Sequence, residues 1–259
     1  MNATIDLLFW QLAAAYLFVL LLIVIVRIKG IPREKDILIA TIRMTLQLIL
    51  VGYLLSYVFG HAHPVYTLLL VAVMLAFAIR TIIKRAKGNM PAAMKRIIVL
   101  SMTSGILVSL IYFIGIVLQL VPWYEPRYVI PIAGMIVGNS MTGIALGVNS
   151  LIEGMHTQKD KVEATLMLGA TPKVAARTIV NQAFDSAMLP TINSMVGMGI
   201  VFLPGMMTGQ ILSGTSPIVA VEYQIAIMLG IVGSVSLSAI LFVQLGYRTF
   251  FNHRSQLDL

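Results

Sequence analysis

Tyr128–Ser150 reads YVIPIAGMIVGNSMTGIALGVNS, a run of 23 residues without one charged side chain. A helix of this length crosses the hydrocarbon core of a bilayer, which is about 30 Å thick. The rest of the chain has the same character, since 59% of its 259 residues are hydrophobic, 11% are charged and the mean hydropathy is +0.94. These values are typical of an integral membrane protein and exclude a soluble domain.

Six further apolar runs flank this segment, and each is long enough to cross a bilayer as a helix. The first run lacks a basic n-region, so it is predicted to be a span and not a signal peptide. We therefore expect an all-α, polytopic membrane bundle of about seven transmembrane helices, folded as one domain over residues 1–259. The predicted spans are Ile5–Ile28, Leu38–Phe59, Val65–Ile83, Ile97–Val121, Tyr128–Ser150, Ala187–Leu212 and Ile218–Tyr247.

The basic residues are unevenly distributed over the connections between these spans. Of the 18 Lys and Arg residues, 17 lie in or beside alternate connections and the C-terminal tail, and only Arg127 lies on the opposite side. Because cytoplasmic connections are rich in Lys and Arg, the N-terminus is expected outside and the C-terminus in the cytoplasm. An odd number of spans fits this orientation. The net charge of +8 then reports membrane orientation, and no nucleic-acid partner is expected.

A polar stretch, EATLMLGATPKVAARTIV (Glu163–Val180), separates the fifth span from the sixth on the predicted cytoplasmic side. Gly169 can adopt the left-handed conformation that ends a helix. Thr171 can cap a new helix with Pro172 at its first position. The sequence thus predicts a helix, a sharp corner and a second helix within residues 157–186, outside the bilayer.

The first of these two helices carries the signs of a docking element. Thr157 followed by Asp160 predicts a capping box at its start. Val162 and Leu166 are four residues apart and fall on one apolar face. A corner with an apolar face outside the bilayer calls for a protein to cover it, and the orientation makes that partner cytoplasmic.

This corner resembles the EAA-x-x-x-G loop of ABC transporter permeases, a coupling helix that docks on the ATP-hydrolysing subunit, although Thr165 replaces the second Ala. The Leu-Pro of importer permeases also comes late, at Leu189-Pro190. A closer resemblance is to the FetB-type permeases, also called YbbM-like. Four motifs carry it in order: VIPIAGMIVGNSM (Val129–Met141), LGATP (Leu168–Pro172), LPT (Leu189–Thr191) and LPGMMTG (Leu203–Gly209).

The resemblance implies the membrane-spanning permease subunit of an ABC transporter for iron export or metal homeostasis, in the inner membrane. It implies a homodimer and a separate cytoplasmic ATPase that binds ATP and Mg²⁺, with no cofactor in this chain. The implied ATPase-coupling residues are Glu163, Ala164, Leu168, Gly169, Ala170, Thr171 and Pro172. The family often has an acid and, three residues later, a Lys after Leu-Pro; Asn193 and Val196 stand there instead.

The sequence also indicates that the energy for active transport must come from another chain. No Gly-Lys dipeptide occurs, so the chain lacks a phosphate-binding P-loop. A membrane enzyme would need a nucleophile with its base or a His-rich metal site, and four scattered His residues do not supply one. A secondary transporter or channel would predict an inverted repeat or buried charges, neither of which is clear. This class and an ABC permease for a non-metal solute remain alternatives.

A candidate substrate path runs through the later spans. Amide and hydroxyl groups in an apolar span either line a path or pack helices together. Leu203-Pro204-Gly205 predicts a helix break, and methionine thioethers suit soft metals or fill gaps. The spacing of His61 and His63 could hold a metal transiently, but without a third ligand a plain loop is favoured, and the metal-binding residues stay unknown. The candidate path residues are Asn139, Ser140, Asn193, Pro204, Met206, Met207 and Glu222.

Overall fold

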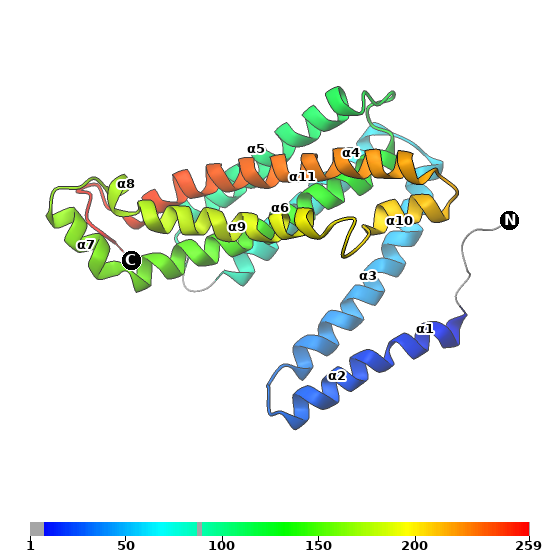
Figure 1. Cartoon of the computed structure of the whole chain (residues 1–259), viewed down its shortest axis with the longest axis horizontal. Helices are drawn as coiled ribbons and strands as arrows, with labels where there is room; N and C mark the ends of the chain where they lie inside the picture. The colour runs from blue at the N-terminus through cyan, green and yellow to red at the C-terminus, as the bar shows by residue number, and fades with distance from the viewer. Residues whose placement is uncertain (1–7, 87–89, 259) are drawn as a thin grey trace.

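The computed structural model describes residues 8–86 and 90–258, which form a bundle of long helices (Figure 1). These residues contain no β-strand, only two isolated bridges, so the predicted all-α class is confirmed. The helices are α1 (Phe9–Ala15), α2 (Leu17–Ile28), α3 (Glu34–Gly60), α4 (Pro64–Arg85), α5 (Ala92–Tyr112), α6 (Pro126–Thr157), α7 (Lys159–Met167), α8 (Pro172–Ala175), α9 (Arg177–Gly197), α10 (Gly205–Leu212) and α11 (Pro217–Gly246). A π-helical turn (Phe113–Val117) extends α5, and a 3-10 turn (Tyr247–Phe250) extends α11.

Within the described ranges, six helical segments are long and apolar enough to cross a membrane, which makes this a multi-pass membrane protein. Their bounds are Trp10–Ile28, Glu34–Gly60, Pro64–Arg85, Ala92–Val117, Pro126–Thr157 and Pro217–Phe250. Ile5, where the first span was predicted to begin, lies outside the described residues. The predicted sixth span, Ala187–Leu212, in which the sequence also predicted a helix break at Leu203-Pro204-Gly205, is not among these six segments. The helix there begins earlier, at Arg177, and is interrupted after Gly197.

The interruption between α9 and α10 lies just before the proline that was expected to cause it. Gly199 takes a positive φ of +83°, and the Val201 amide donates to the Gly197 carbonyl oxygen at 2.8 Å. Pro204 is the residue that caps α10. Proline lacks an amide hydrogen and would end a helix that reached it, but α9 ends earlier, at Gly197, where the turn around Gly199 begins. Local turn bonds then satisfy the backbone groups that a broken helix frees.

Helix α6 is at the centre of the bundle, in contact with α4, α5, α9 and α11. Its closest approach is to α9, where a Cβ atom on Gly143 would lie 2.7 Å from the carbonyl oxygen of Ala187. Small residues of this kind let membrane helices pack backbone against backbone. Farther along the same contact, Gly154 faces Ile179, so α6 and α9 run antiparallel.

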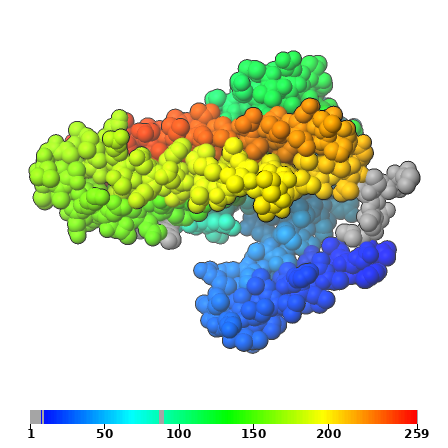
Figure 2. Space-filling view, viewed as in Figure 1, coloured from blue at the N-terminus to red at the C-terminus, as the bar shows by residue number. Residues whose placement is uncertain are grey.

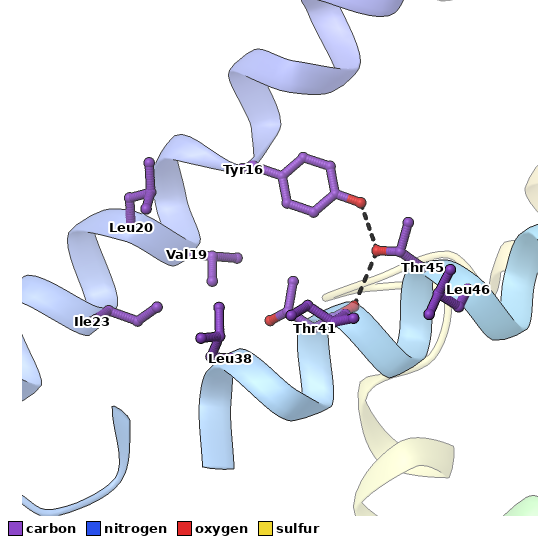
Figure 3. A pocket seen from close by; sticks show the side chains of 9 residues that line it. Tyr16, Val19, Leu20, Ile23, Leu38, Thr41, Thr45 and Leu46 are labelled. Carbon is purple, nitrogen blue, oxygen red and sulfur yellow. Dashed lines mark hydrogen bonds between the residues drawn. The ribbon is translucent and has the colours of Figure 1, made fainter. Parts of the chain in front are cut away.

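Helices α1, α2 and α3 form an arm that stands away from the other helices at one end of the molecule, drawn in blue in Figure 2. Val58 is the only buried residue that α3 contributes among the described residues. Within the arm, the Tyr16 and Thr45 hydroxyl oxygens lie 2.6 Å apart, and Thr45 donates to the Thr41 carbonyl oxygen at 3.0 Å (Figure 3). The groove around this contact is almost wholly apolar.

Candidate functional site

The predicted corner is present, and its first turn has the hydrogen bonds of a Schellman motif. Gly169 follows α7 with a φ of +88°. Its amide donates to the Leu166 carbonyl oxygen at 2.9 Å, and the Ala170 amide donates to the Thr165 carbonyl oxygen at 3.2 Å. These two bonds satisfy carbonyl groups that the end of a helix otherwise leaves free. The chain therefore reverses sharply at Gly169, as its sequence predicts.

The second half of the corner begins as expected, but through backbone bonds alone. Thr171 is the residue before α8 and Pro172 is its first residue. The Thr171 carbonyl oxygen accepts from the amides of Val174 and Ala175 at 2.9 and 3.0 Å, while its side chain makes no capping bond. Pro172 fits because its fixed φ suits the first turn and no partner is needed for an amide there.

The predicted capping box at the start of α7 is wrong. Thr157 is the last residue of α6, and its hydroxyl donates to the carbonyl oxygen of Glu153 at 2.8 Å. Gln158 precedes α7, and its side chain makes no capping bond. Since Thr can bond to the carbonyl four residues earlier, a threonine at the end of a long helix remains in that helix.

The corner has a buried inner face and an exposed apolar tip. Val162 is only 1% exposed, and Leu166 packs against the core of the bundle. At the turn itself, Met167 is 85% exposed and Leu168 is 90% exposed, and Val174 on α8 is exposed as well. The inner face fixes the corner on the bundle, and the tip is free to enter a groove on a partner.

The C-terminal tail folds back beside α7 and forms one wall of a groove that the sequence did not suggest. The groove has a volume of 560 Å³ and lies between α7 and residues 254–257. The Asn252 amide donates to the Gln256 carbonyl oxygen at 2.9 Å, and its side-chain oxygen accepts from the amides of Arg254 and Gln256. An Asn that bonds to the backbone two residues later marks a turn, and it is the local signal for this fold.

Charges around the corner are mostly positive. Lys159 Nζ lies 3.8 Å from Glu163 Oε1, in an exposed pair one turn apart on α7. Such a pair stabilises a helix only slightly, by about 0.3–0.5 kcal/mol, so Glu163 can exchange its partner at little cost. Lys161, Lys173 and Arg254 are exposed nearby. The surface suits a partner with acidic groups around an apolar pocket.

The predicted path residues of α6 and α9 differ in what they contact. The Asn139 side-chain amide donates to the Met135 carbonyl oxygen on its own helix at 2.8 Å. Ser140 is buried, and its hydroxyl oxygen lies 3.1 Å from that of Ser234 on α11. Asn193 is exposed on α9. Ser140 thus joins two helices, whereas Asn139 and Asn193 lie at the surface of the single chain or near it.

The remaining path candidates follow the break. Pro204 and Met206 are half-buried, and Met207 is buried at 9% exposure on α10, which packs against α11. Glu222 is exposed near the start of α11. Within the described ranges, Glu222 makes no hydrogen bond or ion pair with the other candidates.

A polar groove near the start of α9 was not among the sequence candidates. It has a volume of 380 Å³ and lies between α9 and α11, where Asn181, Asp185 and Gln244 line it together with apolar residues. The signal was present, because Asp185 is an ionisable residue two positions before the predicted sixth span. In the part of the chain that the structure describes, no three His, Asp or Glu side chains lie close enough to hold a metal ion.

Comparison with known proteins adds the following. The model of an uncharacterised protein family, UPF0014, matches residues 9–251. The UPF0014 membrane protein YjkA of Bacillus subtilis is 38% identical over 95% of this chain and 97% of its own length. The Probable iron export permease protein FetB of Escherichia coli is 36% identical over 95% of this chain and 93% of its own. Protein ALUMINUM SENSITIVE 3 of Arabidopsis thaliana is 34% identical over 95% of this chain and 88% of its own length. No solved structure matches.

Proposed function

Since this chain belongs to the UPF0014 family of membrane proteins, we propose that it is the membrane-spanning permease subunit of an ABC transporter. The observation that carries the proposal is the corner at Gly169, with Met167 and Leu168 exposed at its tip. It follows the long span α6, on the side where basic residues gather. An apolar tip held rigidly outside the bilayer is suited to a groove on a cytoplasmic subunit.

The partner of the corner is a separate ATPase subunit, in which ATP and Mg²⁺ bind. The absence of a Gly-Lys dipeptide supports this division of labour, because the permease itself has no phosphate-binding loop. ATPase subunits of this class hydrolyse ATP as a pair, and one permease offers one corner. The working assembly is therefore a permease homodimer with two ATPases, placed in the inner membrane of the cell.

The proposed cargo is iron, and the proposed direction is export. The support is the relative FetB, whose name describes a probable iron export permease and which aligns along nearly all of this chain. The family also contains a plant protein named for aluminium sensitivity. An ABC permease for a non-metal solute is the second candidate, favoured by the lack of a metal-binding cluster among the described residues.

The corner can be tested by asking whether its tip holds the ATPase. We would replace Leu168, which is 90% exposed at the corner, with Ser, and make the matched change at Val121, which is 91% exposed in the connection at the predicted outer side. Loss of a buried apolar contact should weaken co-purification with the ABC ATPase subunit from the same organism about ten-fold in Leu168→Ser. Val121→Ser should bind the ATPase as the unchanged protein does.

Equal binding by Leu168→Ser and the unchanged protein would contradict the coupling role of the corner. To confirm that both variants fold, their helical content and their elution on size exclusion in detergent should match those of the unchanged protein. Vesicles that contain the complex should then transport iron only when ATP is supplied on the side of the membrane that carries the ATPase. Transport without ATP would favour a secondary transporter or channel.

A further inference from the structure

A cleft of 820 Å³ opens between α3, α4 and α6, where the arm α1–α3 faces the other helices. Its polar lining includes Arg43 on α3 and Lys84 and Arg85 at the end of α4. Its apolar lining includes Leu48 and Phe77. None of these residues belongs to the corner or to the candidate substrate path.

Three cations in this cleft have no acidic partner among the described residues. Arg33, at the mouth, is bonded to Asp36 at 2.9 Å, and this pair neutralises itself. The Arg43 guanidinium lies 5.1 Å from the centre of the Phe77 ring, a cation–π contact that orients the group but does not neutralise it. Lys84 and Arg85 make no ion pair in the described part of the chain. The cleft therefore carries an uncompensated positive charge.

The depth of Arg43 limits what could neutralise that charge. It lies nine residues after Glu34, the first residue of α3, or about 14 Å along the helix axis. A charged group this far into a span is costly unless it reaches the interface or meets an anion. Since Leu48 and Met44 lie deeper still on the same wall, a ligand that fills the cleft must be charged at one end and apolar at the other.

We propose that this cleft binds the headgroup of an anionic phospholipid from the cytoplasmic leaflet, with Arg43, Lys84 and Arg85 contacting its phosphate. One acyl chain would lie along Leu48 and Phe77. Basic clefts between spans on the cytoplasmic side attract anionic headgroups. The inference rests on the predicted orientation and not on the ATPase, so it can fail while the proposed function stands, and the reverse.

The test is lipid retention by the purified full-length protein without any ATPase, followed by native mass spectrometry. Phosphatidylglycerol and phosphatidylcholine with the same acyl chains are the two probes. The unchanged protein should retain phosphatidylglycerol preferentially. Lys84→Gln with Arg85→Gln should retain it about ten-fold less, because two headgroup contacts are lost. Arg43→Gln should also bind less, whereas Arg43→Lys should keep most of the binding.

A double variant provides the matched control. Lys29→Gln with Lys35→Gln removes two positive charges beside the cleft, one from the connection between α2 and α3 and one from the first turn of α3, but neither residue lines the cleft. If this control lowers retention as much as Lys84→Gln with Arg85→Gln, general surface charge explains the binding and the site is refuted. Equal retention of phosphatidylcholine would refute it as well.

Two other occupants are distinguished by further arms of the experiment. Glycerol 3-phosphate that displaces the lipid at equal concentration would identify a site for a soluble anion. The chain has no cysteine, so Met44→Cys would introduce a single thiol at the cleft. Efficient disulfide dimers of that variant in native membranes would show that a second copy fills the cleft. Either result overturns the lipid assignment.

Discussion

The Ala170 amide donates a hydrogen bond to the carbonyl oxygen of Thr165 at 3.2 Å, and this bond spans the turn at the corner between α7 and α8. It can form only because Gly169, between the two residues, takes a φ of +88°. The direction in which the exposed tip points is therefore set by one backbone conformation. Predictions about coupling can be directed at that conformation.

Gly169→Val should uncouple the permease from its ATPase. A β-branched residue at this φ costs about 1–3 kcal/mol, which the turn can avoid by rearranging. Stimulation of ATP hydrolysis by the permease should fall strongly, while membrane insertion and yield remain unchanged. Gly169→Asn is the matched control, because Asn tolerates the left-handed conformation, and it should keep most of the stimulation. Normal stimulation by purified Gly169→Val would remove the reason to regard the corner as a coupling element.

The assembly should contain two permeases and two ATPases. Each corner offers one apolar tip, and ATP is hydrolysed between paired ATPase subunits. The native mass of the complex during turnover measures this stoichiometry directly. One permease bound to one ATPase in an actively hydrolysing complex would rule out the proposed dimer.

The groove beside α7 should contribute to ATPase binding. Leu257 lines the groove, and His253 belongs to the same tail but does not line it. Leu257→Ala should weaken binding of the ATPase by up to about ten-fold, since apolar contacts at the centre of an interface dominate its affinity. His253→Ala should leave the affinity unchanged. The affinities can be compared by titrating labelled ATPase onto permease in nanodiscs, and equal values would assign the tail a purely structural role.

Close packing of α6 against α9 should be sensitive to a single methyl group. A Cβ atom on Gly143 would lie 2.7 Å from the Ala187 carbonyl oxygen, whereas one on Gly138 meets no atom within 4 Å. Gly143→Ala should therefore destabilise the bundle by about 1–3 kcal/mol. Gly138→Ala should be neutral or stabilise it by up to about 1 kcal/mol. Thermal unfolding in one detergent compares the two variants, and equal midpoints would mean that the helices separate easily.

Transport should favour iron that is chelated or partly hydrated over bare ferrous ion. Hard cations need several oxygen ligands and negative charge, and the candidate path offers amides, thioethers and one acid, Glu222. Vesicles with permease and ATPase should be tested with free ferrous iron, an iron chelate and a neutral solute. Asn139→Leu and Glu222→Gln should both slow the preferred substrate. Free iron moving at full rate in both variants would show that the path lies elsewhere.

At the corner, some features could be predicted from residues close in sequence and others could not. Gly169 and Pro172 were correctly assigned because their backbone preferences act within a few residues. The same reasoning failed at Thr157, whose hydroxyl bonds back to α6, because a threonine has both options and the surrounding helix decides between them. It also located the break near Pro204 but not its start at Met198, which depends on the turn formed with Phe202.

The candidate site was also predictable only in part. The polar residues of the path could be named from the sequence, but their contacts could not. Ser140 pairs with Ser234, which is 94 residues away, whereas Asn139 bonds to its own helix. The C-terminal wall of the groove beside α7 and the basic cleft beside Arg43 gave no continuous pattern, because each combines segments far apart in the chain.

The sequence by itself determined the membrane class, the positions of most spans and the polar corner between the fifth and sixth. It could do so because a segment in lipid must satisfy its own backbone hydrogen bonds, so length and hydropathy decide locally. Only the tertiary structure decided that α6 is central, that α9 already ends at Gly197, and that the tail lies against α7. These features depend on which faces of distant helices fit together, and in lipid that choice is made by close packing and not by hydrophobicity.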